Sequence, residues 1–499
     1  MKRTAWGGLL AALALAVCLS LLPTTARAAD HSHAVCGTTC PDAENHGGHG
    51  EAVDFEEMYY VAATGTEKGK LVYGDNESFA GSGDYTIRSD GKYYLSDNMT
   101  LDAPIYITGS NVTICLNGHS ITVDADGQAI AIAGGSKLTL CDCQGSGTIT
   151  HGTDPDNNEK YIGCGVLVNN GGTFTMYGGS ITGNQVEGSG AGVSVYSGGS
   201  FAMYGGSVTG NTVSSGNTGA GIYTSSGATI GGNAEISGNE ATNGKGAGIY
   251  CSGGDLRIQG NAKITGNKAS GGEGAGIYCY NGNLNIQGKT EISGNEASGG
   301  KGGGVYVETS RTEQTIGGRA KITNNTAADG GGVYMTNYGG TLVLRDNAAI
   351  TENTAIATRT SDVGGISIEY GALKVSGSVQ VTGNARKASE DSEDSKASNV
   401  LVGNDSITVA GELTADARIG VTVYESTLSG VMSGSTTVVA TAEKTGWIRE
   451  SNFSHDGGNG GGLYDILLSA DGMRAELRHD HVWEFSKVLP GSQTQCTLN

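Results

Sequence analysis

The feature that most constrains this chain is an internal repeat, and each copy ends in the motif [IV]-[TS]-x-N. The asparagines that close successive copies are separated by 27, 28, 28, 28, 30, 28 and 31 residues. They are Asn184, Asn211, Asn239, Asn267, Asn295, Asn325, Asn353 and Asn384. A repeat of this length is typical of a solenoid, in which every unit buries its apolar side against its neighbours.

Each unit contains three short segments in which apolar residues alternate with polar ones. In one unit these are Ile249 with Cys251, Leu256 with Ile258, and Ile264. Alternate side chains of a strand point to opposite faces, so these residues share one inward face. The pattern therefore predicts an all-β fold, a right-handed parallel β-helix solenoid with small flanking modules. It should have roughly ten to twelve coils of about 28 residues. We expect a right-handed coil because connections between parallel strands are almost always right-handed.

The repeated asparagines have a predicted role of their own. Asparagine tolerates the left-handed backbone conformation, so each should occupy the tight turn after the third strand. Stacked coil upon coil, their amides should form an inward hydrogen-bonded ladder, as in cross-β assemblies.

Composition excludes several other classes of protein. The 86 glycines and only 5 prolines argue against collagen, which needs proline in a triplet period, and against a helical bundle. Charged residues make up only 16%, too few for a charge-driven disordered chain. The formal net charge of −20 repels phosphate backbones, so nucleic acid is not an expected partner.

The two ends differ from the repeats. The run from Leu9 to Leu22 is apolar and Ala26-Arg27-Ala28 fits a cleavage site, so residues 1–28 are predicted to be a signal peptide. No second long apolar run follows, so we expect a secreted or cell-surface chain without a membrane-spanning segment. The expected order after the signal is a His/Cys-containing segment and cap at 29–88, the parallel β-helix at 89–424, a C-terminal β cap at 425–478, and the start of a truncated module at 479–499.

A group of candidate metal ligands follows the signal. Its members are His31, His33, Cys36, Cys40, His46 and His49. Zinc needs four nitrogen or sulfur ligands, which six such groups could supply, so zinc is a candidate cofactor. The alternative is a small disulfide between Cys36 and Cys40 with solvated histidines.

Cys115 and Cys141 align at outward positions of successive coils. Stacked strand neighbours lie about 4.8 Å apart, within reach of a disulfide bond. Cys143 is the rival partner for either residue.

Five consecutive coils carry a tyrosine at the outward position of the first strand. They are Tyr223, Tyr250, Tyr278, Tyr306 and Tyr334. Facing solvent, they would form an aromatic stripe suited to a polysaccharide or a surface protein. The alternative is that the rings only stabilise the stacking of strands.

Five segments carry a resemblance to known proteins. They are HSHAVCGTTC at 31–40, YYLSDNMTL at 93–101, VTICLNGHSI at 112–121, LTLCDCQGSGTIT at 138–150, and the FTMYGGSITGN units from 174. The chain resembles right-handed parallel β-helix proteins of the pectate-lyase-like superfamily, and more closely exported repeat proteins of anaerobic Gram-positive bacteria. The resemblance implies the fold but no single activity, because this fold carries lyases, hydrolases, adhesins and inert scaffolds.

Three functions are therefore in competition. The first is a non-catalytic scaffold or adhesion rod, and the second is a polysaccharide lyase or glycoside hydrolase. The third is a glycan-binding module. A lyase or hydrolase needs acidic and basic residues clustered on one face of consecutive coils, whereas the outward first-strand positions from Leu167 to Ser367 carry neither. This favours the non-catalytic rod.

Overall fold

The computed structural model describes residues 31–35, 52–64, 69–80, 83–214, 216, 218–309, 313–357, 359, 361–402, 406–423, 431, 436–456 and 464–479. The predicted signal peptide at 1–28 lies outside these residues, as do Cys36, Cys40, His46 and His49. All but the first residue of the predicted module at 479–499 also lies outside them.

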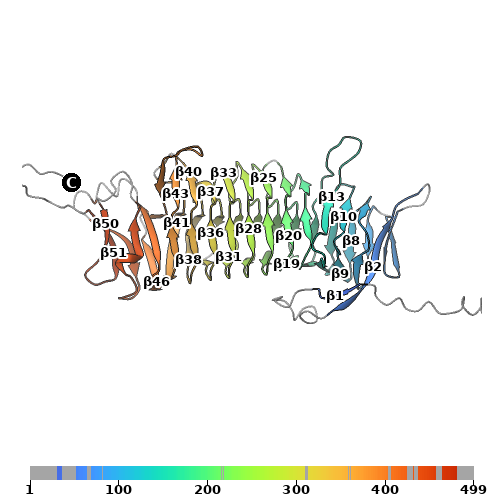
Figure 1. Ribbon diagram of the computed structural model, residues 1–499, viewed down its shortest axis with the longest axis horizontal. Helices are drawn as coiled ribbons and strands as arrows, with labels where there is room; N and C mark the ends of the chain where they lie inside the picture. Colours follow the sequence, from blue (N-terminus) through green and yellow to red (C-terminus); the bar gives the residue numbers. More distant parts are fainter. Residues whose placement is uncertain are drawn as a thin grey trace, which may run out of the picture.

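The chain forms a right-handed parallel β-helix of about ten coils, each of about 28 residues, which confirms the predicted fold. The coils stack along the long axis of the molecule and form a rod (Figure 1). Most strands of the coils pair in parallel with the equivalent strand one coil away, so these strands form rows that run along the rod.

The first row holds the opening strand of each coil, and its in-register pairs include Ile249 with Ile277. Its members are β5 (Tyr85–Ile87), β8 (Ile105–Thr108), β11 (Ile130–Ala133), β14 (Val166–Val168), β18 (Val193–Val195), β22 (Ile222–Thr224), β26 (Ile249–Cys251), β30 (Ile277–Tyr280), β34 (Val305–Glu308), the start of β38 (Val333–Leu344), the start of β41 (Ile366–Gly377), and β45 (Val400–Val402).

The second row follows in each coil, and its in-register pairs include Leu256 with Leu284. It comprises β6 (Gly91–Leu95), β9 (Asn111–Cys115), β12 (Lys137–Cys141), β15 (Thr173–Met176), β19 (Ser200–Met203), β23 (Gly227–Ile230), β27 (Asp255–Ile258), β31 (Asn283–Ile286), β35 (Glu313–Ile316), the ends of β38 and β41, β46 (Ile407–Leu413), and β48 (Thr437–Ala442).

The third row precedes the repeated asparagines, and its in-register pairs include Ile236 with Ile264. It comprises β7 (Met99–Leu101), β10 (Ser120–Val123), β13 (Thr148–His151), β16 (Ser180–Thr182), β20 (Ser207–Thr209), β24 (Glu235–Ser237), β28 (Lys263–Thr265), β32 (Glu291–Ser293), β36 (Lys321–Thr323), β39 (Ala349–Thr351), β42 (Gln380–Thr382), β47 (Arg418–Val423), and β49 (Phe453–His455).

A fourth row, which the sequence analysis missed, forms a separate small sheet after the asparagines. It comprises β17 (Gln185–Val186), β21 (Thr212–Val213), β25 (Glu240–Thr242), β29 (Lys268–Ser270), β33 (Glu296–Lys301), β37 (Thr326–Asp329), β40 (Thr354–Ile356), β43 (Ala385–Lys387), and the antiparallel β44 (Ser395–Ala397). Its inward side chains are mostly alanines, such as Ala241 and Ala269, and they form a second small core.

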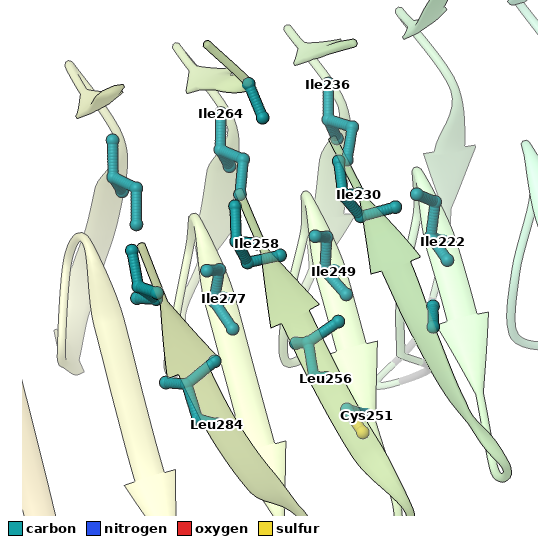
Figure 2. Close-up of a cluster of buried hydrophobic side chains, with 14 of the residues drawn as sticks. Ile222, Ile230, Ile236, Ile249, Cys251, Leu256, Ile258, Ile264, Ile277 and Leu284 are labelled. Atoms are coloured by element: carbon teal, nitrogen blue, oxygen red, sulfur yellow. The ribbon is translucent and has the colours of Figure 1, made fainter. Parts of the chain in front are cut away.

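The main core is a set of aliphatic columns that run along the rod axis. Ile222, Ile249 and Ile277 form one column, and Ile230 and Ile258 belong to another (Figure 2). These side chains are fully buried, as the alternation predicts. Burial of a side chain of this size contributes about 1.5–3 kcal/mol, so the columns hold each coil on the next.

The predicted turn conformation of the ladder asparagines is wrong. The left-handed conformation belongs to the residue before each asparagine, for example Gly238 at φ 59° and Gly266 at φ 61°. The asparagine itself is then free to turn its amide into the core. Two coils lack glycine at this position and have Asn324 and Glu352 there, both at positive φ.

Both ends of the β-helix are covered by additional strands that include antiparallel pairs. At the N-terminal end β2 (Val53–Val61) pairs with β6 and carries the meander β3 (Lys70–Tyr73) and β4 (Asn76–Phe79). At the C-terminal end β51 (Arg474–His479) pairs with β48 and with β50 (Tyr464–Leu468), beside the short helix η2 (Glu450–Asn452). The covers pair strand edges that would otherwise invite aggregation. No helix in the described part of the chain has the length and hydrophobicity to span a membrane.

Candidate functional site

Two histidines of the N-terminal segment are held on one face of a short strand. The strand β1 (His31–His33) pairs antiparallel with β2, which places His31 opposite Phe55 and His33 opposite Val53. Residues two apart on a strand share a face. Both imidazoles therefore point the same way, and Ser32 between them is exposed.

Two cysteines on the wall of the β-helix come close to these histidines. Cys115 ends β9 and is paired in register with Cys141 at the end of β12, and Cys143 follows two residues later. Cys115 and Cys141 point outward but are buried, because Phe55 and neighbouring residues of the N-terminal segment pack over them. Cys143 stays exposed. In Figure 1, β1 lies along the rod close to β9.

His31, His33, Cys115 and Cys143, hereafter the His/Cys cluster, form a compact group of potential ligands. Each offers one ligand atom, and the four atoms lie within 4.8 Å of one another. The Sγ atoms of Cys115 and Cys143 are 3.7 Å apart, and Cys143 Sγ is 3.5 Å from His31 Nε2. It is the one group of three or more such residues found in the described ranges.

The imidazole planes are fixed by aromatic neighbours. His31 stacks on Tyr94 with ring centroids 4.6 Å apart, and His33 stacks on Phe55 at 4.4 Å. His33 Nδ1 is 2.7 Å from the carbonyl oxygen of Ala34, so this nitrogen carries the proton and donates it. The other ring nitrogen, Nε2, is buried and has no hydrogen-bond partner.

The thiols of this region differ in acidity. The hydrogen bond with Cys141 lowers the pKa of Cys115 and correspondingly raises the pKa of Cys141. Cys143 is exposed as a residue, but partial desolvation of its thiol raises its pKa, and the thiol donates to Asn117 Oδ1 at 3.4 Å. Of Cys115, Cys141 and Cys143, Cys115 is therefore the residue in which a thiolate is most readily accommodated.

The structure brings together only part of the predicted metal cluster. His31 and His33 lie side by side, but their described partners are Cys115 and Cys143, from more than 80 residues further along the chain. The predicted alignment of Cys115 with Cys141 on successive coils is confirmed, and both are free thiols in the structure. Spacing within residues 31–49 gave no signal for this long-range grouping. The only available hint was the Cys-x-Cys pair at 141–143.

The tyrosine stripe is continuous, but the prediction that it is exposed is wrong for three of its five rings. Its rings stack face to face, with centroid separations of 5.8, 5.1, 4.6 and 5.1 Å from Tyr223 to Tyr334. Tyr278 and Tyr334 are only 1% exposed and Tyr306 is 6% exposed. Glycines at the start of each coil, such as Gly274 and Gly302, let the preceding turn pass close to the Cα and Cβ atoms of Tyr278 and Tyr306. Tyr223 and Tyr250 are half-buried, so it is the three buried rings that offer no free face to a sugar.

The tyrosine hydroxyls are also engaged. Tyr278 donates to Glu308 and Tyr334 donates to Glu369. Lys245 lies 3.1 Å from the Tyr278 hydroxyl and 2.9 Å from Glu273. Burial is the main cause that raises the pKa of each of these tyrosines, and it raises the pKa of Tyr250 to about 12. The phenols therefore stay neutral at physiological pH.

The asparagine ladder is buried and continuous, as predicted. Each Nδ2 donates to the Oδ1 of the next coil, for example from Asn239 to Asn267 at 2.9 Å. The ladder extends beyond the predicted eight residues to Asn399 and ends on the carboxylate of Asp456. At its other end, His151 Nδ1 lies 2.8 Å from Asn184 Oδ1. Burial lowers the pKa of His151 and raises that of Asp456.

Comparison with known proteins supports the fold and does not specify an activity. Residues 105–318 match a family described as "Right handed beta helix region". The matched segment contains most of the regular coils, so the chain is similar to that family over its central part. Neither the curated proteins nor the solved structures gave a match.

Proposed function

We propose that this chain is an exported, non-catalytic β-helix rod that serves as a scaffold or adhesion module at the cell surface. The observation that carries this proposal is that the outward-pointing tyrosines contact one another and residues of neighbouring coils. Their rings and hydroxyls are engaged with neighbouring coils, through pairs such as Tyr278 with Glu308. In an enzyme, outward side chains such as these would be free to contact a substrate. In this chain they join one coil to the next.

The distribution of charged residues supports the same proposal. Along the third row Glu235, Lys263, Glu291 and Lys321 are opposed in register, so charges alternate in sign between coils. In the fourth row Lys268 and Glu296 form an ion pair at 3.6 Å. Within the described residues, the one close group of potential metal ligands is the His/Cys cluster, not the carboxylate cluster that a calcium-dependent lyase needs.

The deciding experiment is an activity screen of the purified chain on a panel of polysaccharides. Reducing ends would report hydrolysis and unsaturated products would report a lyase. We expect neither above the level of heat-unfolded protein, with or without added calcium. Activity that copurifies with the folded chain would replace the proposal with a carbohydrate-active enzyme. Saturable binding on a glycan array without product would replace it with a glycan-binding module.

A further inference from the structure

We propose that His31, His33, Cys115 and Cys143 form a tetrahedral zinc site that fastens the N-terminal strand β1 to two successive coils of the β-helix. The site is distinct from the cluster predicted from the sequence, because half of its ligands come from the wall of the rod. Two histidines and two cysteines are one of the ligand sets that structural zinc sites use.

Two of the separations between ligand atoms match those expected around a tetrahedral metal. Zinc–sulfur bonds of about 2.3 Å at tetrahedral angles place two sulfur atoms about 3.8 Å apart. The observed separation between Cys115 and Cys143 Sγ is 3.7 Å. With a zinc–nitrogen bond of about 2.0–2.1 Å the expected sulfur–nitrogen separation is about 3.5 Å. Cys143 Sγ and His31 Nε2 are 3.5 Å apart.

The unpartnered nitrogen of His33 is the second, independent observation. Its Nε2 is buried without a hydrogen-bond partner, which is costly unless something occupies that lone pair. The opposite nitrogen, Nδ1, already donates to the carbonyl of Ala34. Metal-binding histidines characteristically donate the other ring proton to an oxygen, since this fixes the tautomer and aims the free lone pair at the metal.

The location of the site explains what the metal would do. β1 has only three residues and is held by pairing with β2. Ring stacking on Tyr94 and Phe55 orients its histidines toward the wall. A zinc ion would join this strand to β9 through Cys115 and to the segment after β12 through Cys143. The metal would then bridge the N-terminal segment and the rod, with two bonds to each.

A disulfide is the competing fate of the same cysteines. A disulfide between Cys115 and Cys143 needs a sulfur–sulfur distance of about 2.05 Å. The observed 3.7 Å is a non-bonded contact, and both residues are free thiols. Such a disulfide would remove two of the four ligands, so the two outcomes exclude each other and can be separated by experiment.

The test is the metal content of the purified full chain, measured by mass spectrometry after zinc loading and removal of excess metal. We expect close to one zinc per chain. Cys143→Ser, which changes an exposed residue, should lower zinc affinity by more than about 100-fold, and His31→Gln should do the same. Cys164→Ser is the matched control and should keep the metal. The double variant Cys36→Ser/Cys40→Ser should also keep it.

Cobalt substitution gives a second readout that does not depend on stability. A tetrahedral site with two thiolates should show intense visible absorption and sulfur-to-cobalt charge transfer, both lost in Cys143→Ser. Circular dichroism of each variant shows whether the rod is folded. A folded wild-type chain without bound zinc would overturn the proposal. So would loss of zinc in the Cys36/Cys40 double variant, or a Cys115–Cys143 disulfide in protein purified without reductant.

Discussion

Each ladder asparagine satisfies several buried backbone and side-chain groups at once. The Nδ2 of Asn267 donates to Ile236 O and to Asn295 Oδ1, while its Oδ1 accepts from the backbone and side-chain nitrogens of Asn239. No apolar residue could fill this position without leaving those groups unpaired. The repeat therefore keeps an amide at a position that is fully buried.

Removing one rung should be far more costly than removing an exposed asparagine. Asn267→Ala leaves buried groups of Asn239 and Ile236 unpaired, at about 1–3 kcal/mol for each group. We expect a loss of about 3–5 kcal/mol in the free energy of unfolding, measured by urea denaturation. Asn261→Ala is the control, because its amide contacts Asn233 on the surface and its loss should cost less than about 0.5 kcal/mol. Equal effects would contradict the role of the ladder.

The residue before each asparagine offers a stabilising substitution. Glu352 has φ 61° at a position where most coils have glycine, such as Gly238 and Gly266. A side chain in this conformation costs about 1–2 kcal/mol, partly offset by the greater freedom of glycine in the unfolded chain. Glu352→Gly should therefore raise the free energy of unfolding by about 0.5–1 kcal/mol. Glu235 is an exposed residue at the start of β24, and Glu235→Gly should lower the free energy of unfolding. If both glycine variants were stabilised, the effect would be due to the loss of negative charge instead.

At the level of elements, the tyrosine stack is a further apolar cluster on the outer side of the first row of strands. Tyr278, Tyr306 and Tyr334 form their own apolar cluster, with Tyr250 packed against it. Lys245 and Lys301 lie over the rings of Tyr278 and Tyr334, at 4.8 and 4.3 Å from the ring centroids. Stacked aromatic pairs add about 0.5–1.5 kcal/mol beyond the area that they bury.

Truncating this stack should therefore destabilise the rod. We expect Tyr278→Ser to lower the free energy of unfolding by about 3–5 kcal/mol, as for other buried aromatics. Tyr280→Ser is the matched control on the same strand, since Tyr280 is 39% exposed, and it should change stability by less than about 0.5 kcal/mol. Tyr278→Phe keeps the ring and should cost only about 1 kcal/mol. An unaffected Tyr278→Ser variant would show that the stack is not part of the core.

The elements also show what could be predicted from the sequence and what could not. Period-two alternation assigned the inward faces of three rows, because residues such as Ile249 and Leu256 have one-sided patterns. The fourth row has two or three residues per strand in most coils and is lined by alanine, so it carried no such signal. Alternation also placed Tyr278 outward correctly. It could not show that the ring is buried between neighbouring tyrosines, with its hydroxyl hydrogen-bonded to a glutamate.

The His/Cys cluster marks a second limit of the sequence. Alignment of the repeats predicted that Cys115 and Cys141 are neighbours, because coil register is a local property. The approach of His31 to Cys143 depends instead on how the N-terminal segment folds over the first coils. No periodicity links that segment to the rod, so the pairing could be recognised only once the tertiary structure was known.

At the scale of the molecule, the rod is a stack of nearly interchangeable coils. Each coil contacts mainly its neighbours, so stability should be close to a sum of coil and interface terms. Deleting residues 240–267 joins Asn239 to Lys268 and preserves the ladder, the columns and the tyrosine stack in register. We expect this variant to fold and unfold cooperatively by circular dichroism. Deleting 240–253 alone breaks the register and should abolish cooperative unfolding.

The one-coil deletion also tests whether alternating charges set the order of coils. Glu235 faces Lys263 in the intact rod, but after the deletion it faces Glu291. Glu235→Lys should therefore destabilise the intact chain and stabilise the shortened one, each by about 0.2–1 kcal/mol in the free energy of unfolding at low salt. Both effects should shrink in high salt, because exposed charges are screened. The same sign in both backgrounds would mean that the substitution acts within its own coil, and that charge alternation contributes nothing to coil order.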